Sequence, residues 1–144
     1  MKIVISKSRI VETVLAMSAL EVLDGRRDGS AVLTRDESPA LEVLVDNGAA
    51  VVVMGLLRHV ADTDVGSGRG DEDLLTIEFK GDDSTGVASV VRRRLEEGLT
   101  HYVLSMARDD GGTAHREAFD TAVADIRGML AASYRPAGRP GAWM

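Results

Sequence analysis

The most regular hydrophobic pattern in the chain covers residues 84–108. Its apolar residues recur at steps of three and four, which places them on one side of a helix with 3.6 residues per turn. They are Val87, Val90, Val91, Leu95, Leu99, Tyr102, Val103 and Met106. The opposite side carries charged residues and His101, and the stripe keeps its phase across Gly98. The segment therefore predicts one long amphipathic helix of about six turns.

Two other segments have helical patterns with recognisable ends. Ser6 or Ser8 caps a first helix that runs to about Asp24, and Gly25 is typical of the left-handed residue that ends a helix. Residues 113–133 carry a second apolar stripe at helical spacing and predict the last helix of the chain.

Shorter segments connect these helices. Residues 74–80 alternate apolar and polar side chains, which predicts a strand that ends at the turn 81–83. Residues 2–5 form a short extended lead, and the polar residues 25–35 connect the first helix to the next element.

Residues 38–61 admit two interpretations. Valine favours strands, and the Asn-Gly pair at 47–48 fits the turn of a hairpin over residues 41–54. Ser38-Pro39 instead favours the start of a helix. The apolar stripe of that helix is Leu41, Leu44, Val45, Gly48, Val52, Gly55, Leu56 and Val60. We predict a helix that is buried almost all round, in which the two glycines let a neighbour approach closely.

The segment 62–73 combines glycines with carboxylates and predicts a flexible acidic loop. Its acidic residues are Asp62, Asp64, Asp71, Glu72 and Asp73. They lack the spacing of a calcium-binding loop, and Gly66–Gly70 lacks the Gly-Lys-Ser/Thr of a phosphate-binding loop. We expect a solvated loop, in which Asp71, Glu72 and Asp73 contact a partner protein.

Proline excludes a helix from residues 134–144, which we expect to form an extended basic tail. Its candidate partner-binding residues are Arg135, Pro136, Arg139, Pro140 and Trp143. The whole pattern predicts a mainly α fold: a four-helix bundle-like domain over residues 1–133, with one short strand or β-hairpin and the extended C-terminal tail.

Composition narrows the class of protein. The 144 residues fit one domain, and 44% apolar but only 3% aromatic residues predict an aliphatic core. A net charge of −6 argues against a protein that coats DNA. The chain has no cysteine, which excludes disulfides and thiolate metal sites. No uninterrupted apolar run is long enough for a membrane span, so we expect a soluble protein made in the cytoplasm.

No pattern predicts a chemical reaction. His59, His101 and His115 fall on three predicted helices, and two of them could meet in the core, but none forms a metal-binding pair on one helix face. No nucleophile motif is present, so we expect neither an enzyme nor a cofactor or metal. For Arg92-Arg93-Arg94, a salt bridge at a subunit interface or a solvated face is favoured over phosphate binding.

The order of these elements resembles the head-completion (head-to-tail connector) proteins of tailed bacteriophages and prophages. The residues that carry the resemblance are Lys2–Ser8, Thr34–Glu37, the strand at 74–80, and Ala124–Arg127 running into Tyr134–Pro136. The resemblance covers most of the chain but is architectural. The valine-rich second helix and the scarcity of aromatic residues depart from the family pattern.

The resemblance implies a non-enzymatic protein of the virion. About twelve identical subunits would form a head-to-tail ring beneath the portal, extend the DNA channel and offer a surface to the tail. The implied partners are the chain itself, the portal protein and tail or neck proteins, while DNA passes without specific binding. Residues 84–108 and 113–133 would form the wall of the ring.

There are two alternatives, of which the second belongs to a different class of protein. A tail terminator or other neck protein is favoured if residues 41–54 form a hairpin, because those folds place helices on a sheet. A small cytosolic binding protein of the immunity type would instead act as a monomer or dimer and bind one partner through its acidic loop.

Overall fold

The computed structural model describes residues 1–25, 32–66, 73–83, 86–107 and 112–133. The helices are α1 (Lys7–Leu23), α2 (Ser38–Gly55), α3 (Val87–Met106) and α4 (Thr113–Ser133), and the strands are β1 (Lys2–Ser6), β2 (Val60–Thr63) and β3 (Leu74–Phe79). One 3₁₀ turn precedes α2 at Arg35–Glu37, and another follows it at Leu57–His59. The predicted mainly helical class is confirmed.

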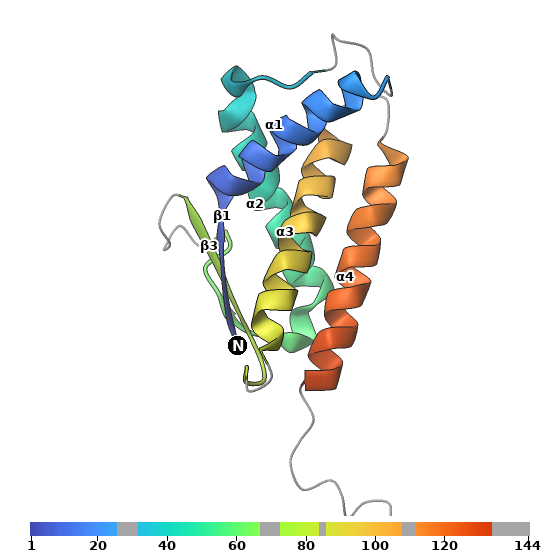
Figure 1. The fold of residues 1–144 in the computed structure, drawn as a ribbon. Helices are drawn as coiled ribbons and strands as arrows, with labels where there is room; N and C mark the ends of the chain where they lie inside the picture. Colours follow the sequence, from blue (N-terminus) through green and yellow to red (C-terminus); the bar gives the residue numbers. More distant parts are fainter. Residues whose placement is uncertain (26–31, 67–72, 84–85, 108–111, 134–144) are drawn as a thin grey trace, which may run out of the picture.

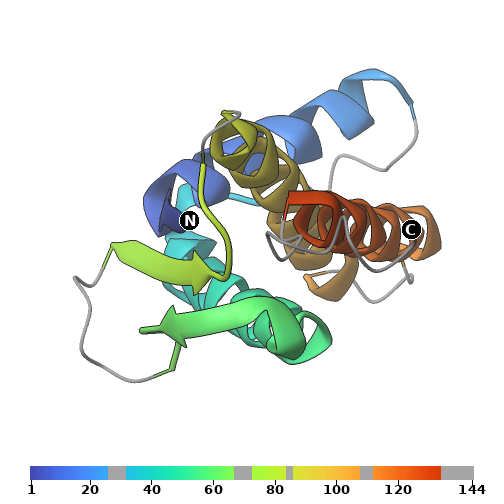
Figure 2. The same cartoon turned by 90° about the horizontal axis from the view of Figure 1, so that it is seen from below.

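Helix α3 is the central element of the fold. It contacts α1, α2, α4 and β1, and most closely α4, which lies beside it (Figure 1). Seen along the helices, the strands lie on one side of the molecule and α4 on another (Figure 2). The predicted stripe of α3 is buried except at Val87, which is partly buried, and at Val90 and Met106, which are about half exposed. The long amphipathic helix is therefore confirmed, with its inner face filled by the chain's own core.

The three strands form one antiparallel sheet in the order β1-β3-β2. The extended lead at residues 2–5 is part of β1, because its alternate side chains Ile3 and Ile5 are buried against the helices while β3 supplies hydrogen bonds. Strand β2 takes Asp62 and Thr63 from the segment that was predicted as a loop. The predicted strand at 74–80 is confirmed as β3, the central strand.

Helix α2 decides between the two interpretations of residues 38–61 in favour of the helix. Its inner face consists of Leu41, Val45, Gly48, Ala49 and Val52. At Gly48 a Cβ atom would lie 2.7 Å from Cδ1 of Tyr102, so this glycine allows α3 to approach closely. The prediction of burial almost all round is wrong, because Val43 and Met54 on the other side are 56% and 71% exposed.

The ends of α1 follow the local signals in the sequence. The Ser6 hydroxyl accepts a hydrogen bond from the Arg9 N–H at 3.3 Å, which caps the first turn. After the last turn, Gly25 takes the left-handed conformation with φ of +74°. Both predicted ends are therefore confirmed.

Candidate protein interface

Helix α2 presents an exposed face without a single charged residue. We call this face, together with the first residue of the 3₁₀ turn that follows it, the α2 seam; it consists of Ala40, Val43, Asn47, Ala50 and Met54 of α2 and Leu57 of the turn. All six residues are exposed, and Met54, Leu57 and Val43 are 71%, 58% and 56% accessible to solvent. The exposed side of a helix in a globular protein normally carries charged and polar residues. Contiguous apolar surface of this kind marks a binding surface.

The spacing of the α2 seam indicates what kind of surface fits it. Its residues follow one another at steps of three, four, three, four and three, the repeat with which one helix packs along another. The only polar side chain in the seam, Asn47, lies near its middle. A single asparagine at such a position specifies the register between two helices at some cost in stability. The pattern therefore favours a second helix as the partner surface.

The two ends of the α2 seam carry opposite charges. Asp36 and Glu37 are exposed in the 3₁₀ turn that leads into α2. At the other end, burial lowers the pKa of His59, and the positive charges of Arg58, Arg127 and Lys80 lower it further. Arg35 in the same turn as Asp36 and Glu37 is paired with Glu12 on α1. The seam therefore has two carboxylates that Arg35 does not neutralise at the start of α2 and the positive charge of Arg58 at its end.

The same helix meets a simple length-and-composition criterion for a membrane span, over Arg35–Gly55. Its inner side, however, packs on α3 and α1 and belongs to the core of the domain. The core helix of a soluble protein meets the criterion equally well. Only the outer side of α2 therefore needs to be covered by something outside the domain.

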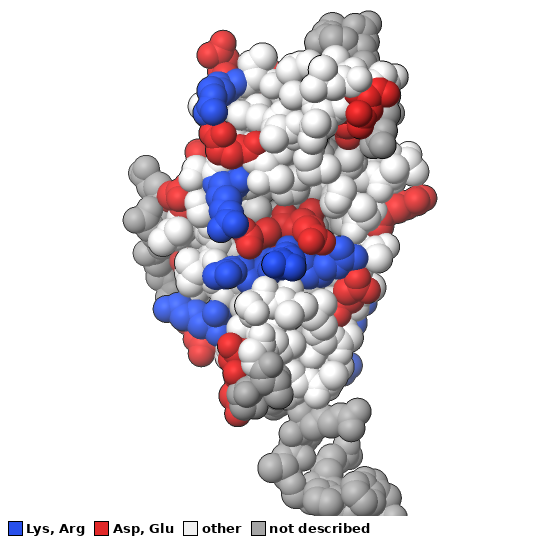
Figure 3. Space-filling view, in the orientation of Figure 1, with Lys and Arg blue, Asp and Glu red and all other residues white. Residues whose placement is uncertain are grey.

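The arginine triplet lies on α3. Basic side chains form a band, bordered by acidic ones, across the face of the molecule seen in Figure 3. Arg94 is held within the chain: it donates to Asp125 Oδ2 at 2.6 Å and to Glu97 Oε2 at 2.7 Å, which joins α3 to α4. Arg92 lies 3.9 Å from Glu96, one turn further along α3. The predicted subunit-interface role of Arg92, Arg93 and Arg94 stays a prediction, and Arg94 has a partner without it.

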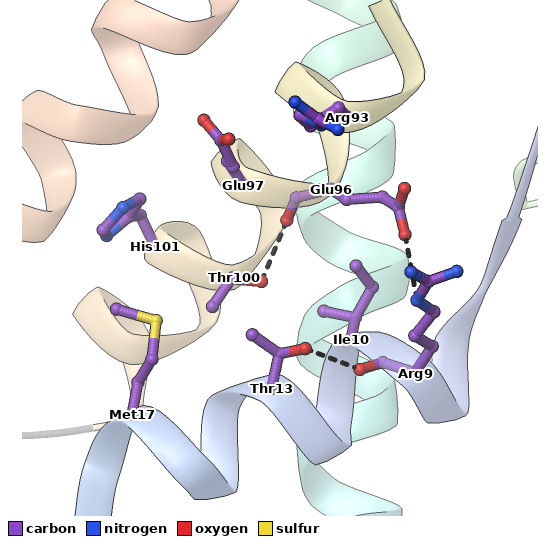
Figure 4. Close-up of a pocket in the computed structure, with 9 residues that line it drawn as sticks. All are labelled: Arg9, Ile10, Thr13, Met17, Arg93, Glu96, Glu97, Thr100 and His101. Atoms are coloured by element: carbon purple, nitrogen blue, oxygen red, sulfur yellow. Dashed lines mark hydrogen bonds and ion pairs between the residues drawn. The ribbon is translucent and has the colours of Figure 1, made fainter. Parts of the chain in front are cut away.

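A shallow groove of about 220 Å³ runs between α1 and α3 (Figure 4). Its lining residues are Arg9, Ile10, Thr13, Met17, Arg93, Glu96, Glu97, Thr100 and His101. Glu96 lies 3.7 Å from Arg9 on the opposite wall, so the two charges partly neutralise each other. The groove has charges of both signs beside an apolar floor, and its charges do not converge on one point.

Two histidines meet between α3 and α4, as the sequence allowed. Nδ1 of His101 lies 2.9 Å from Nδ1 of His115, and Nε2 of His115 lies 2.5 Å from Oε1 of Glu21 on α1. Burial lowers the pKa of His101, and the neighbouring His115 lowers it further. Glu21 was not singled out in the sequence, because nothing local indicates a contact 94 residues away. The cluster joins three helices through polar contacts.

Among the described residues, no group of three or more histidine, cysteine or acidic side chains is arranged to hold a metal ion. His59 lies apart from the other two, in the 3₁₀ turn after α2.

Three of the acidic residues from segment 62–73 make hydrogen bonds within the described residues. Asp62 Oδ1 accepts a hydrogen bond from the Thr63 N–H at 2.9 Å. Asp64 Oδ1 accepts a hydrogen bond from the Thr76 N–H at 2.7 Å. Asp73 accepts from the Ser6 hydroxyl at 2.8 Å and the Ser8 N–H at 2.9 Å, and these bonds lower its pKa. The other candidate partner-binding residues lie outside the described residues: Asp71, Glu72, Arg135, Pro136, Arg139, Pro140 and Trp143.

Comparison with known proteins finds no matching family model, no matching curated protein and no matching solved structure. The α2 seam is an exposed surface that lacks the charged residues a solvated helix normally carries.

Proposed function

We propose that this chain is a structural subunit of the neck of a tailed phage. In this proposal it forms a homo-oligomeric ring of about twelve copies between portal and tail and extends the DNA channel. The α2 seam carries the proposal, because contiguous exposed apolar surface on a helix marks a surface that binds another protein. A subunit of a permanent ring buries such a surface against its neighbour.

The rest of the molecule supports the same function. The four helices expected from the resemblance to the connector family are present, with a helix rather than a hairpin at Ser38–Gly55, and a three-stranded sheet accompanies them. A hairpin there would have favoured a tail terminator. The net charge of −6 suits a channel wall that must not hold passing DNA. The tail residues 134–144 are proposed contacts with the neighbouring neck or portal proteins.

The first test is mass spectrometry of sedimented particles from the source culture, followed by electron microscopy of the particles that contain this chain. Neck function predicts a low copy number beside a portal protein and density between head and tail. A chain found only in the soluble fraction, bound to one non-structural partner, would overturn this function and favour an immunity-type binding protein.

A matched pair of variants tests whether assembly uses the α2 seam. Particles that lack the chain are supplied with Met54→Glu or with Leu23→Glu, which places the same charge on an exposed leucine at the end of α1, outside the seam and the proposed ring wall. We expect tailed particles with Leu23→Glu and tailless heads with Met54→Glu. Normal tailed particles with both variants would contradict a role of the seam in the neck.

A further inference from the structure

We propose that in the free protein the α2 seam of one copy is covered by the α2 seam of a second copy. The two helices run antiparallel and are related by a two-fold axis that passes between Asn47 and Ala50. This pairing does not depend on the proposed function, since it concerns the chain in solution. Three features of the described residues support it: the order of side chains in the seam, the charges at its ends and the position of its asparagine.

The order of side chains makes the α2 seam complementary to itself. In an antiparallel pair about this axis, residues whose numbers add up to about 97 face each other. Met54 then faces Val43, and Asn47 faces Ala50. The largest exposed side chains at one end of the seam thus meet smaller ones at the start of the partner helix. The small residues at the centre let the two backbones approach closely, as interdigitating helices require.

The end charges select the antiparallel orientation. An antiparallel pair brings the acidic start of one α2, at Asp36 and Glu37, close to Arg58 of the second copy. A parallel pair would bring Arg58 beside its own counterpart and the acidic turns beside each other. Unlike charges at the rim guide the orientation of a complex, and like charges oppose it. The opposed helix dipoles favour the same orientation.

The position of Asn47 accounts for the number of copies. Near the two-fold axis, the Asn47 side chains of both copies lie in adjacent layers, where each amide can donate to and accept from protein groups. Any shift of register would move each amide among apolar side chains and leave it without a partner. A two-fold contact uses the same surface on both chains and closes on itself, so the pairing stops at the dimer.

During neck assembly the two-fold contact between seams would be replaced by a head-to-tail contact between ring subunits. A ring between two different neighbours is polar, and its subunits meet head to tail through two different surfaces. The seam of a subunit that enters such a ring must therefore leave its two-fold partner. In this view the dimer keeps the seam covered until the assembly site is reached.

Disulfide crosslinking tests the pairing, because the chain contains no cysteine of its own. We would prepare Val43→Cys, Met54→Cys and the double variant, oxidise each, and separate the products on a non-reducing gel. The antiparallel pair predicts a covalent dimer from the double variant and from an equal mixture of the two single variants, but none from either single variant alone. The two positions are three helical turns apart, so one chain cannot crosslink to itself.

Three results would overturn the pairing. A covalent dimer from Val43→Cys alone indicates a parallel pair. No crosslink from the double variant indicates that something else covers the seam, or nothing. Flotation of the wild-type monomer with vesicles of phosphatidylcholine and phosphatidylglycerol would assign the seam to a membrane surface. A crosslinked dimer whose chain is absent from phage particles would leave the pairing in place and overturn only the neck function.

A charge exchange at the rim gives a second test. We expect Asp36→Arg and Arg58→Asp each to raise the dissociation constant of the dimer several-fold, because each places like charges at both ends of the pair. The double variant restores unlike charges and should return the constant to near the wild-type value. A double variant that dimerises more weakly than either single variant contradicts the antiparallel orientation.

Discussion

Helices α2 and α3 pack against each other and have nearly the same length, yet they use their apolar residues differently. Helix α3 carries one apolar stripe, and the chain's own core covers nearly all of it. Helix α2 carries apolar residues on both sides, and only its inner side is covered. The comparison shows how an interface can be recognised: a helix there carries more apolar surface than its own domain buries.

We expect the largest difference in unfolding free energy between a side chain shortened on the inner side of α2 and one shortened on its outer side. Leu41 on the inner side is 2% exposed, so Leu41→Ala leaves a cavity and should cost about 2–5 kcal/mol of unfolding free energy. Met54→Ala removes an exposed side chain and should change the stability of the monomer by less than about 0.5 kcal/mol. Urea unfolding at concentrations too low for association measures both values. Equal losses from the two variants would remove the distinction between the sides of α2.

The next effect concerns two glycines on the same helix. A Cβ at Gly48 would lie 2.7 Å from Tyr102 Cδ1 and 3.1 Å from Leu99 Cδ2, so Gly48→Ala forces α2 and α3 apart and should cost about 1–3 kcal/mol. At Gly55 the nearest atom would be 3.7 Å away, and alanine should stabilise the helix by up to about 1 kcal/mol. Thermal unfolding of the two variants gives the comparison. A stable Gly48→Ala protein would show that the approach of Tyr102 is not required.

The close approach at Gly48 illustrates what the sequence could predict. Local signals sufficed where a residue acts on its own neighbours, as with the Ser6 cap, the left-handed Gly25 and the proline at the start of α2. The same apolar pattern predicted α2 as a helix but placed it in the core on all sides. Periodicity reports that a face is apolar, and it cannot report whether the same chain or another molecule covers that face.

Contacts between segments that lie far apart in the sequence were also not predicted. Strand β1 was predicted only as an extended lead, because five residues are too few for a periodic signal and its partner β3 lies about 70 residues further along. The contact of Glu21 with His115 depends in the same way on how α1 crosses α4. Asp73 was assigned to a partner-binding loop, whereas its carboxylate caps α1 through Ser6 and Ser8.

The smallest effect is a dependence of stability on pH that arises between α3 and α4. Burial and the neighbouring His115 lower the pKa of His101 below its usual value of 6.5. The unfolded chain therefore binds a proton more readily than the folded chain, so stability falls as the pH drops below about 6.5. Replacing His101 by glutamine should reduce this loss, measured as the change in melting temperature between pH 7.5 and pH 5.5.

His59 shares the direction of this shift and supplies the control. Because the pKa values of both histidines are lowered, His101→Gln should reduce the loss of stability at low pH without abolishing it. Combining His101→Gln with His59→Gln should reduce that loss further. If the melting temperature falls equally on acidification in the wild type and in the His101→Gln variant, the pH dependence arises outside the α3–α4 contact.

The most direct measurement of the central claim is sedimentation velocity of the purified chain over a hundredfold range of concentration. A covered α2 seam predicts a species of twice the chain mass that dissociates on dilution. It also predicts a Met54→Glu variant that sediments as a single chain and a Met106→Glu variant that still sediments as the dimer. A wild-type chain that stays monomeric at every concentration, or a Met54→Glu variant that associates as strongly as wild type, would contradict it.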